Sequence, residues 1–361
     1  MADTQDSLFP DLPRPEDASA AASPSAKAQA AEPSAKKKPR NATVEAAPTN
    51  PELVELAAAL PTNLRLGTSS WSYPGWADLV WDGEYAETVL SKNGLSALAK
   101  HPLFRTVSVD RNFYRALTAS QYARYASMVP DDFRFMVKAP SLVTDATVRD
   151  ESGRGMQANP VFLSSEIARQ EFVLPTLEGL GHRIGVLVFQ LSPIPGHILA
   201  DQPALLARIA AMLESLPDLR STAPDAVIAV EVRDPQLLNP AFAEMLRSVG
   251  ATFCMGLHAK MPPIEDQLPM LRALWPGPLV CRWNLHRRHG RFGYEDAEKL
   301  YGPFDKIVDP DPETRAALAK VIAGTTRAGQ NAFVTVSNNA EGCAPLTIAQ
   351  LARDILELAP R

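Results

Sequence analysis

Between residues 64 and 358 the chain alternates short apolar runs with longer amphipathic stretches. Apolar runs bounded by turn-forming residues are typical of buried strands, and the stretches between them have the spacing of helices packed on one face. The predicted strands cover residues 64–68, 104–109, 133–137, 184–190, 226–230, 252–255, 279–283 and 332–336. Each is followed by a helical pattern, over residues 91–100, 119–128, 164–180, 202–216, 240–249, 267–274, 312–328 and 345–358.

A strand and a helix that alternate eight times predict a closed (β/α)8 TIM barrel, a fold of the α/β class. The barrel domain is assigned to residues 63–361, which is longer than the ~250 residues typical of the fold. The surplus lies in two loops, residues 139–163 after the third strand and 285–310 after the seventh. Because such loops lie on the ligand-binding face of a barrel, each is interpreted either as a lid or as surface decoration.

The first 50 residues have a different composition, rich in Ala, Pro, Ser and Lys, with Phe9 as the only aromatic residue. Such a segment buries too little apolar surface to offset the entropy of ordering it. Residues 1–50 are therefore predicted to be a disordered tail. The basic stretch at residues 36–40 is interpreted as a solvated charge run.

Composition restricts the class of protein further. The chain has 46% hydrophobic residues and a formal net charge of -5, which favours a small-molecule ligand over a large nucleic-acid footprint. No apolar run approaches the ~18 residues needed to span a bilayer, and no signal peptide is recognised, so a cytoplasmic location without membrane contact is predicted. Cys254, Cys281 and Cys343 are expected to be reduced core thiols.

In a parallel barrel the residues that follow each strand converge on one mouth. The first predicted strand is followed by Trp71, Tyr73 and Trp76, within a turn that also holds Pro74 and Gly75. These rings are predicted to stack on a sugar or a base. The alternative is that they plug the top of the barrel.

Ionisable residues follow other strands, and the predicted catalytic set is Lys138, Glu231 and Asp110. A lysine at the end of a buried strand is costly unless it is paired or catalytic, so Lys138 is interpreted as an electrostatic clamp, a base or a Schiff-base amine. The alternative is an ion pair with Glu231 or Asp110. Glu231 follows a largely apolar run and is the predicted general acid/base.

Further polar residues at the strand ends are predicted to hold the ligand, since an arginine fork facing amides suits a carboxylate, a phosphate or a polyol. The predicted ligand-binding residues are Trp71, Tyr73, Trp76, Tyr114, Gln190, Arg233, Arg282, Asn284, Asn338 and Asn339. No metal or other cofactor is predicted, because the chain has no glycine-rich nucleotide loop and no zinc-binding helix motif. The alternative is a metal held by His258 with Glu231 and Asp110.

The strand-end segments together resemble the YecE-like family, a group of barrels classed as a domain of unknown function. The matching pieces are residues 67–71 with Tyr73, Gly75 and Trp76; residues 113–115; Phe135 with residues 137–140; residues 189–191 with Pro193; Glu231 with Arg233; Arg282; and Asn338, Asn339, Gly342 and Ala344. The resemblance covers nearly all of residues 64–358. It implies a TIM barrel and no established reaction.

The chain departs from that family's pattern at several ionisable positions, so it resembles a divergent member. Ser108 and Asp110 stand where a glutamate and an asparagine are usual. Asp145 stands where a histidine is usual after the third strand, and Asn284 where one is usual after the seventh. Asp234 and Leu237 stand where a histidine-tryptophan pair is usual. A sugar-isomerase-like activity is therefore not carried over from typical members.

The tail holds a second pattern, Gln5-Asp6-Ser7-Leu8-Phe9. It resembles the short peptide with which bacterial DNA-repair and replication proteins bind the sliding clamp. In that mode a glutamine is followed by an apolar-aromatic pair that enters a hydrophobic pocket. The pattern makes the sliding clamp a candidate partner through Gln5, Leu8 and Phe9.

Three functions are compatible with these observations. The leading one is an enzyme with isomerase- or hydrolase-type acid/base chemistry on a sugar, a phosphosugar or a nucleoside-like molecule. The second is a metabolite-binding protein without catalysis. The third is a DNA-maintenance protein recruited through its tail, and the oligomeric state stays open.

Overall fold

The computed structural model describes residues 43–149, 156–290 and 293–358 of the chain. Eight parallel strands close into a barrel in the order β1-β10-β9-β8-β7-β6-β3-β2. They are β1 (Leu64–Thr68), β2 (Thr106–Val109), β3 (Arg134–Lys138), β6 (Ile184–Gln190), β7 (Val227–Glu231), β8 (Thr252–Leu257), β9 (Leu279–Trp283) and β10 (Ala332–Val336). The predicted TIM barrel is confirmed.

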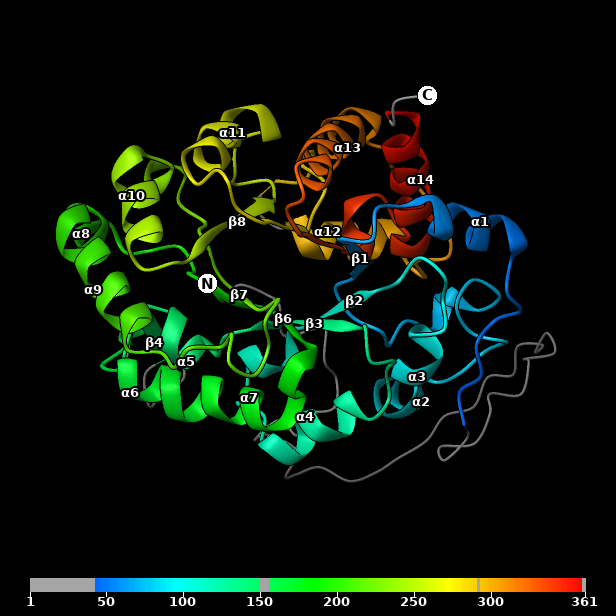
Figure 1. Ribbon diagram of the computed structural model, residues 1–361, viewed down its shortest axis with the longest axis horizontal. Coiled ribbons are helices and arrows are strands. Elements are labelled where there is room, and N and C mark those ends of the chain that lie inside the picture. Colours follow the sequence, from blue (N-terminus) through cyan, green and yellow to red (C-terminus); the bar gives the residue numbers. More distant parts are fainter. Residues whose placement is uncertain (1–42, 150–155, 291–292, 359–361) are drawn as a thin grey trace, which may run out of the picture.

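Helices surround the ring of strands (Figure 1). The principal ones are α2 (Glu87–Asn93), α3 (Leu95–Leu98), α4 (Ala119–Ala126), α7 (Leu174–Leu180), α9 (Gln202–Glu214), α10 (Pro240–Ser248), α11 (Ile264–Ala273), α13 (Pro312–Arg327) and α14 (Ala344–Glu357). The helix predicted over 164–180 is divided, because α6 (Ser165–Ile167) and the π-helical η4 (Ala168–Val173) precede α7. Within the described ranges, no helix combines the length and the apolar composition required to cross a bilayer.

Shorter elements lie in the loops. The loop after β3 contains α5 (Ser141–Thr144) and the antiparallel pair β4 (Thr147–Arg149) and β5 (Met156–Ala158), and the loop after β9 contains α12 (Gly293–Tyr301). The other short helices are η2 (Pro74–Trp76), η3 (Arg111–Phe113), η5 (Gly181–Arg183), α8 (Gly196–Leu199), η6 (Pro235–Leu237) and η7 (Asn338–Ala340). Both loops that the sequence marks as enlarged therefore carry structure of their own.

Local sequence explains where several helices begin. Asn239 and Asp311 each accept a hydrogen bond from a backbone N–H of the first turn, of Phe242 in α10 and of Thr314 in α13. Both helices have proline at their first position, where no N–H is needed. These caps satisfy donors that have no partner within the helix.

The apolar core has two main parts. The smaller one fills the inside of the barrel with Met136, Val186, Val188, Ala229, Cys254, Val280 and Phe333. The larger one lies between the strands and the surrounding helices and includes residues of nearly every element. The three cysteines are free and buried, as the sequence predicts.

The segment before β1 packs on the barrel domain. Val44 is 3% exposed and Ala46 forms a β-bridge with Trp81. The helix α1 (Pro51–Ala59) lies beside α14 (Figure 1), where Glu52 pairs with Arg353 at 2.6 Å. The packed structure therefore extends upstream of the predicted tail boundary at residue 50.

Two glycines test the packing of the barrel. A Cβ at Gly67 of β1 would lie 1.7 Å from the carbonyl oxygen of Thr106, whereas a Cβ at Gly324 of α13 would have nothing within 4 Å. Gly67→Ala is expected to lower the free energy of unfolding by about 3 kcal/mol through overpacking. Gly324→Ala is expected to raise it by about 0.5–1 kcal/mol, because alanine is the better helix former. Urea unfolding of both variants measures the difference, and a neutral Gly67→Ala would contradict the close approach of β1 and β2.

Candidate active site

Along the strands, the side chains inside the barrel change from apolar to polar or charged between one inward-facing position and the next. The apolar cluster inside the barrel includes Met136, Val188, Ala229 and Val280. Because successive side chains point to opposite faces of a strand, the residue two positions further along also faces inward. Those residues are Lys138, Gln190, Glu231 and Arg282, and all four are buried. The mouth therefore holds a polar and charged layer that rests on an apolar one.

Glu231 is the centre of this layer. Its Oε1 lies 2.8 Å from Arg233 Nη2, and its Oε2 lies 2.8 Å from Arg282 Nη1. Asn284 donates a hydrogen bond from Nδ2 to Oε1 at 3.2 Å. Burial raises the pKa of Glu231, but the guanidinium groups of Arg233 and Arg282 outweigh burial and hold that pKa below its ordinary value. An ionised carboxylate engaged on both oxygens fits the positioning of two arginines better than the predicted general acid/base role.

Arg282 joins Glu231 to a second carboxylate. Its Nη2 forms a short ion pair with Asp110, the residue after β2, and its Nη1 also donates to Gln190 Oε1 at 3.2 Å. The hydroxyl of Ser108 donates to Asp110 Oδ1. Asp110 retains 22% side-chain exposure, whereas Glu231 has none. Asp110 is therefore the carboxylate of the pair that a ligand can reach.

Lys138 lies in the same layer with a different environment. Its Nζ lies 3.5 Å from the centre of the Phe113 ring, and no described residue gives Nζ a hydrogen bond or an ion pair. The alternative prediction, an ion pair with Glu231 or Asp110, is therefore wrong, because Arg233 and Arg282 occupy those carboxylates.

Burial sets the ionisation of Lys138. Loss of water lowers the pKa of this amine to about 7, since the attraction of Asp110 only partly offsets burial and Arg282 and Arg233 repel the charged form. The charges of the layer agree with this direction, because two carboxylates already balance two guanidinium groups. At neutral pH Lys138 can both accept and give a proton.

A small cavity opens onto these groups, with a volume of about 50 Å³. It is lined by Ser69, Ser70, Tyr73, Asp110, Tyr114, Lys138, Asn284, Tyr294, Ser337 and Asn339. A second cavity of about 20 Å³ shares Ser69, Ser70 and Asp110 with the first. Ser69 Oγ and Asn339 Oδ1 are buried without a hydrogen-bond partner among the described residues. Such atoms are normally satisfied by a ligand or by ordered water.

The aromatic residues after β1 do not form an open stacking surface. Trp76 is fully buried, and its Nε1 donates to Asn338 Oδ1 at 3.2 Å. Trp71 is 7% exposed and packs edge-on against Tyr125 with ring centres 5.3 Å apart. Tyr73 is the ring of the three that lines the cavity with Lys138. Trp71 thus packs against the surrounding helices, and Trp76 is buried and held by Asn338.

The loop after β9 covers part of the mouth. It brings Tyr294 of α12 to the cavity, and Phe304 meets Tyr73 with ring centres 5.5 Å apart. The backbone N–H of His286 donates to the carbonyl oxygen of Asn339 at 2.8 Å. Sequence reasoning did not single out Tyr294, because nothing local distinguishes one aromatic residue within a long loop.

His258 does not form the predicted alternative metal site. It is 8% exposed, its Nδ1 accepts a hydrogen bond from the backbone N–H of Lys260, and burial with the charge of Arg233 lowers its pKa to about 3. Across the described ranges, His, Cys, Asp and Glu side chains form no group of three that could hold a metal ion. Arg282 bonds both Glu231 and Asp110, which makes these carboxylates partners of an arginine.

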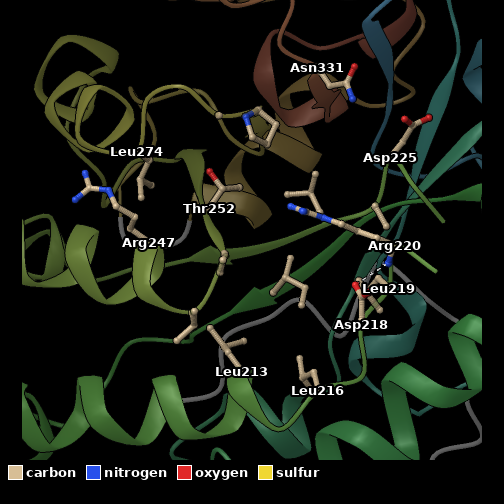
Figure 2. Close-up of a pocket in the computed structure, with 18 of the residues that line it drawn as sticks. Leu213, Leu216, Asp218, Leu219, Arg220, Asp225, Arg247, Thr252, Leu274 and Asn331 are labelled. Carbon is tan, nitrogen blue, oxygen red and sulfur yellow. Dashed lines mark hydrogen bonds between the residues drawn. The ribbon is translucent and has the colours of Figure 1, made fainter. Parts of the chain in front are cut away.

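A much larger groove, drawn in Figure 2, lies at the N-terminal ends of the strands, opposite the mouth. Its volume is about 740 Å³, and it is lined by the first residues of β7 and β8, with Arg220 and Arg247 exposed beside them. In this fold the face at the strand N-termini generally serves stability, and ligands bind at the other face. The buried ionisable groups around Lys138 therefore identify the smaller cavity as the candidate site.

Comparisons with known proteins agree with this architecture. A family model described as "Protein of unknown function DUF72", the YecE-like family that the strand-end segments resemble, matches residues 65–360. A solved DUF72 family protein from Enterococcus faecalis V583 is 16% identical, with a TM-score of 0.52, 82% of this chain covered and 97% of the other. Another from Thermotoga maritima MSB8 is 20% identical, with a TM-score of 0.49 and coverages of 81% and 99%. No curated protein matches the chain. At these identities the first structure shows a shared fold and nothing about the reaction.

The network predicts the effect of removing its central charge. Glu231→Gln leaves Arg233 and Arg282 buried without their shared carboxylate, which is expected to lower the free energy of unfolding by about 3–5 kcal/mol. Glu214→Gln, at an exposed position of α9, is the control and is expected to stay within about 0.5 kcal/mol of the parent chain. Urea unfolding followed by circular dichroism measures both. Equal stability of the two variants would show that Glu231 does not hold the arginines.

Proposed function

Because the chain belongs to the DUF72 family, whose description names no reaction, we propose its function from the mouth of the barrel. We propose that it is an enzyme that binds a small polar compound in the cavity beside Lys138 and transfers protons on that compound. The observation that carries the proposal is a buried amine, with a pKa lowered to about 7, that opens onto a polar cavity also lined by Asp110. Perturbed ionisable groups that converge on a cavity are typical of catalytic sites.

The lining of the cavity supports a hydroxyl-bearing ligand. Hydroxyl groups come from serine and tyrosine side chains, and Asn284 and Asn339 add amide groups that both donate and accept hydrogen bonds. The volume of about 50 Å³ is far below the ~300 Å³ at the lower end of sites for drug-sized ligands. These features favour a short-chain hydroxy or keto compound, or one end of a sugar, over a nucleoside.

The proposed roles follow from reach and ionisation. Lys138 and Asp110 line the cavity and are assigned to the reacting atoms. Glu231 and Arg282 lie below them and fix the position of Asp110, so they are positioning residues. A base and a carboxylate on one cavity support proton transfer between neighbouring atoms of the ligand, as in an isomerase. Activation of water by the same pair, as in a hydrolase, is the second reaction type they support.

A screen of short-chain sugars and hydroxy-carbonyl compounds tests this proposal. Thermal shift identifies compounds that bind, and NMR then follows their conversion. Lys138→Met and Asp110→Asn are each expected to lower kcat by about 10²–10⁴-fold, the usual contribution of a proton-transfer group, while thermal shifts persist. Lys100→Met, at a side chain that is 62% exposed, is the control and is expected to keep full activity.

Two results would contradict the proposed enzyme. Tight binding without conversion by the parent chain would establish a non-catalytic metabolite-binding protein instead. Full activity of both site variants would show that the reaction, if present, uses other residues.

A second function is favoured by the pattern Gln5-Asp6-Ser7-Leu8-Phe9, which lies outside the described residues. We propose that this peptide binds the bacterial sliding clamp by inserting Leu8 and Phe9 into a hydrophobic pocket. The formal net charge of -5 disfavours direct DNA binding by the chain itself, so a peptide anchor would be its route to DNA maintenance.

Capture by the immobilised clamp tests the anchor with the full chain. The double variant Leu8→Ala and Phe9→Ala is expected to lose capture, because it removes the side chains that would enter the pocket. Leu12→Ala, in the same segment and outside the pattern, is the control and is expected to keep it. Equal capture of the parent chain and the double variant, or no capture of either, would contradict the anchor.

A further inference from the structure

Lys138 differs from the other cations of the mouth in what its nitrogen contacts. Arg233 and Arg282 each lie 2.8 Å from an oxygen of Glu231. Lys138 Nζ instead lies 3.5 Å from the centre of the Phe113 ring, and its side chain lines the cavity. A lysine that served only to neutralise a carboxylate would be in contact with one. Its nitrogen is therefore not engaged by the protein's own carboxylates, and its side chain is at the cavity.

We propose that the ligand carries an aldehyde or ketone group and that Lys138 Nζ forms an imine with its carbonyl carbon. The inference rests on the proposed function, since it assigns a substrate class and a covalent step to the same cavity. Amines that act in this way are commonly buried in apolar surroundings or lie beside other cations, because both conditions favour the neutral, nucleophilic form. Lys138 meets both conditions, since it is 2% exposed and two arginines lie in the same layer.

The step balances without an added oxidant or reductant. The nitrogen lone pair attacks the carbonyl carbon and forms a C–N bond, while the π electrons of the carbonyl move to its oxygen. That oxygen takes one proton, and the nitrogen gives up one proton. The C–O bond of this carbinolamine then breaks, the hydroxyl leaves as water after taking a second proton, the nitrogen gives up its second proton, and a C=N bond forms. One amine and one carbonyl compound thus give one imine and one water.

The cavity holds groups that can move these protons. Asp110 lines it and is 22% exposed at the side chain, so its carboxylate can take each proton that the nitrogen loses and pass it to the oxygen that leaves as water. Arg282 keeps Asp110 in place through their ion pair. Tyr73, Tyr114 and Tyr294 also line the cavity.

The ionisation of Lys138 supports the same step. Burial lowers its pKa to about 7, the charges of Asp110 and Glu231 acting against this shift and those of Arg282 and Arg233 adding to it. At pH 7 about half of such amines are neutral, whereas a lysine with the ordinary pKa of about 10.4 is neutral in roughly one molecule in a few thousand. Adduct formation at Lys138 should therefore rise with pH through about 7 and then level off.

Reductive trapping with the full chain tests the proposal. The chain is incubated briefly with dihydroxyacetone or glycolaldehyde and sodium cyanoborohydride, then digested and mapped by mass spectrometry. The expected adduct on Lys138 adds the mass of the carbonyl compound, less one water and plus two hydrogens. At pH 7 it should form at least about tenfold faster than adducts on Lys100 and Lys320 in the same digest, because far more of the Lys138 amine is neutral. Glycerol, which lacks the carbonyl group, is the control and should give no adduct.

The outcomes separate this proposal from the proposed function. Adducts on Lys100 and Lys320 with Lys138 unmodified would overturn the imine, and the parent chain supplies this result even if Lys138→Met fails to fold. Loss of conversion in Lys138→Met without any adduct in the parent chain would also overturn the imine, and would leave Lys138 as a proton-transfer group. A Lys138 adduct in a chain that converts no compound would support the imine and contradict the enzyme.

Discussion

A charge inside a closed barrel must find its counter-charge on another strand of the same barrel, because water is excluded there and an unpaired ion is costly. Glu231 at the end of β7 meets this constraint with Arg282 of β9 and with Arg233. Gly256 of β8 makes room for the carboxylate, since a Cβ at that position would lie 3.1 Å from Glu231 Oε1. The charged layer of the mouth therefore depends on a buried ion network and on the residue that leaves space for it.

The same pairing explains why Lys138 has no ion-pair partner among the described residues. Two carboxylates and two guanidinium groups neutralise one another, so a fifth charge has no counter-ion left within the layer. The loop after β9, which covers part of the mouth, is held by contacts of its own. Arg288 pairs with Asp309, whose Oδ2 accepts a hydrogen bond from Tyr301 at 2.9 Å. His289 Nε2 lies 2.7 Å from the Tyr301 hydroxyl. These contacts fix the C-terminal end of α12, the helix that places Tyr294 at the cavity.

Membership of the DUF72 family accounts for the barrel and does not account for the cavity. Asp110 and Asn284, two positions at which the sequence is expected to depart from the pattern of YecE-like proteins, both line the cavity and both hydrogen-bond the ion network. Ser108, a third such position, donates to Asp110. The departures thus form one connected group and not isolated changes. The chemistry proposed for this chain is therefore built on these residues.

The sequence by itself determined the barrel and the place of its mouth. The bounds predicted for β1, β6, β9 and β10 match the structure, because a buried strand is marked by a local run of apolar residues between turn signals. The same local pattern places Lys138 and Glu231 at strand ends. Which charges pair was decided only by the tertiary structure, since an ion pair depends on distances between residues on different strands, such as the 172 positions that separate Asp110 from Arg282. The burial of Trp76 and the arrival of Tyr294 at the cavity were decided in the same way, because both depend on how loops pack across the mouth.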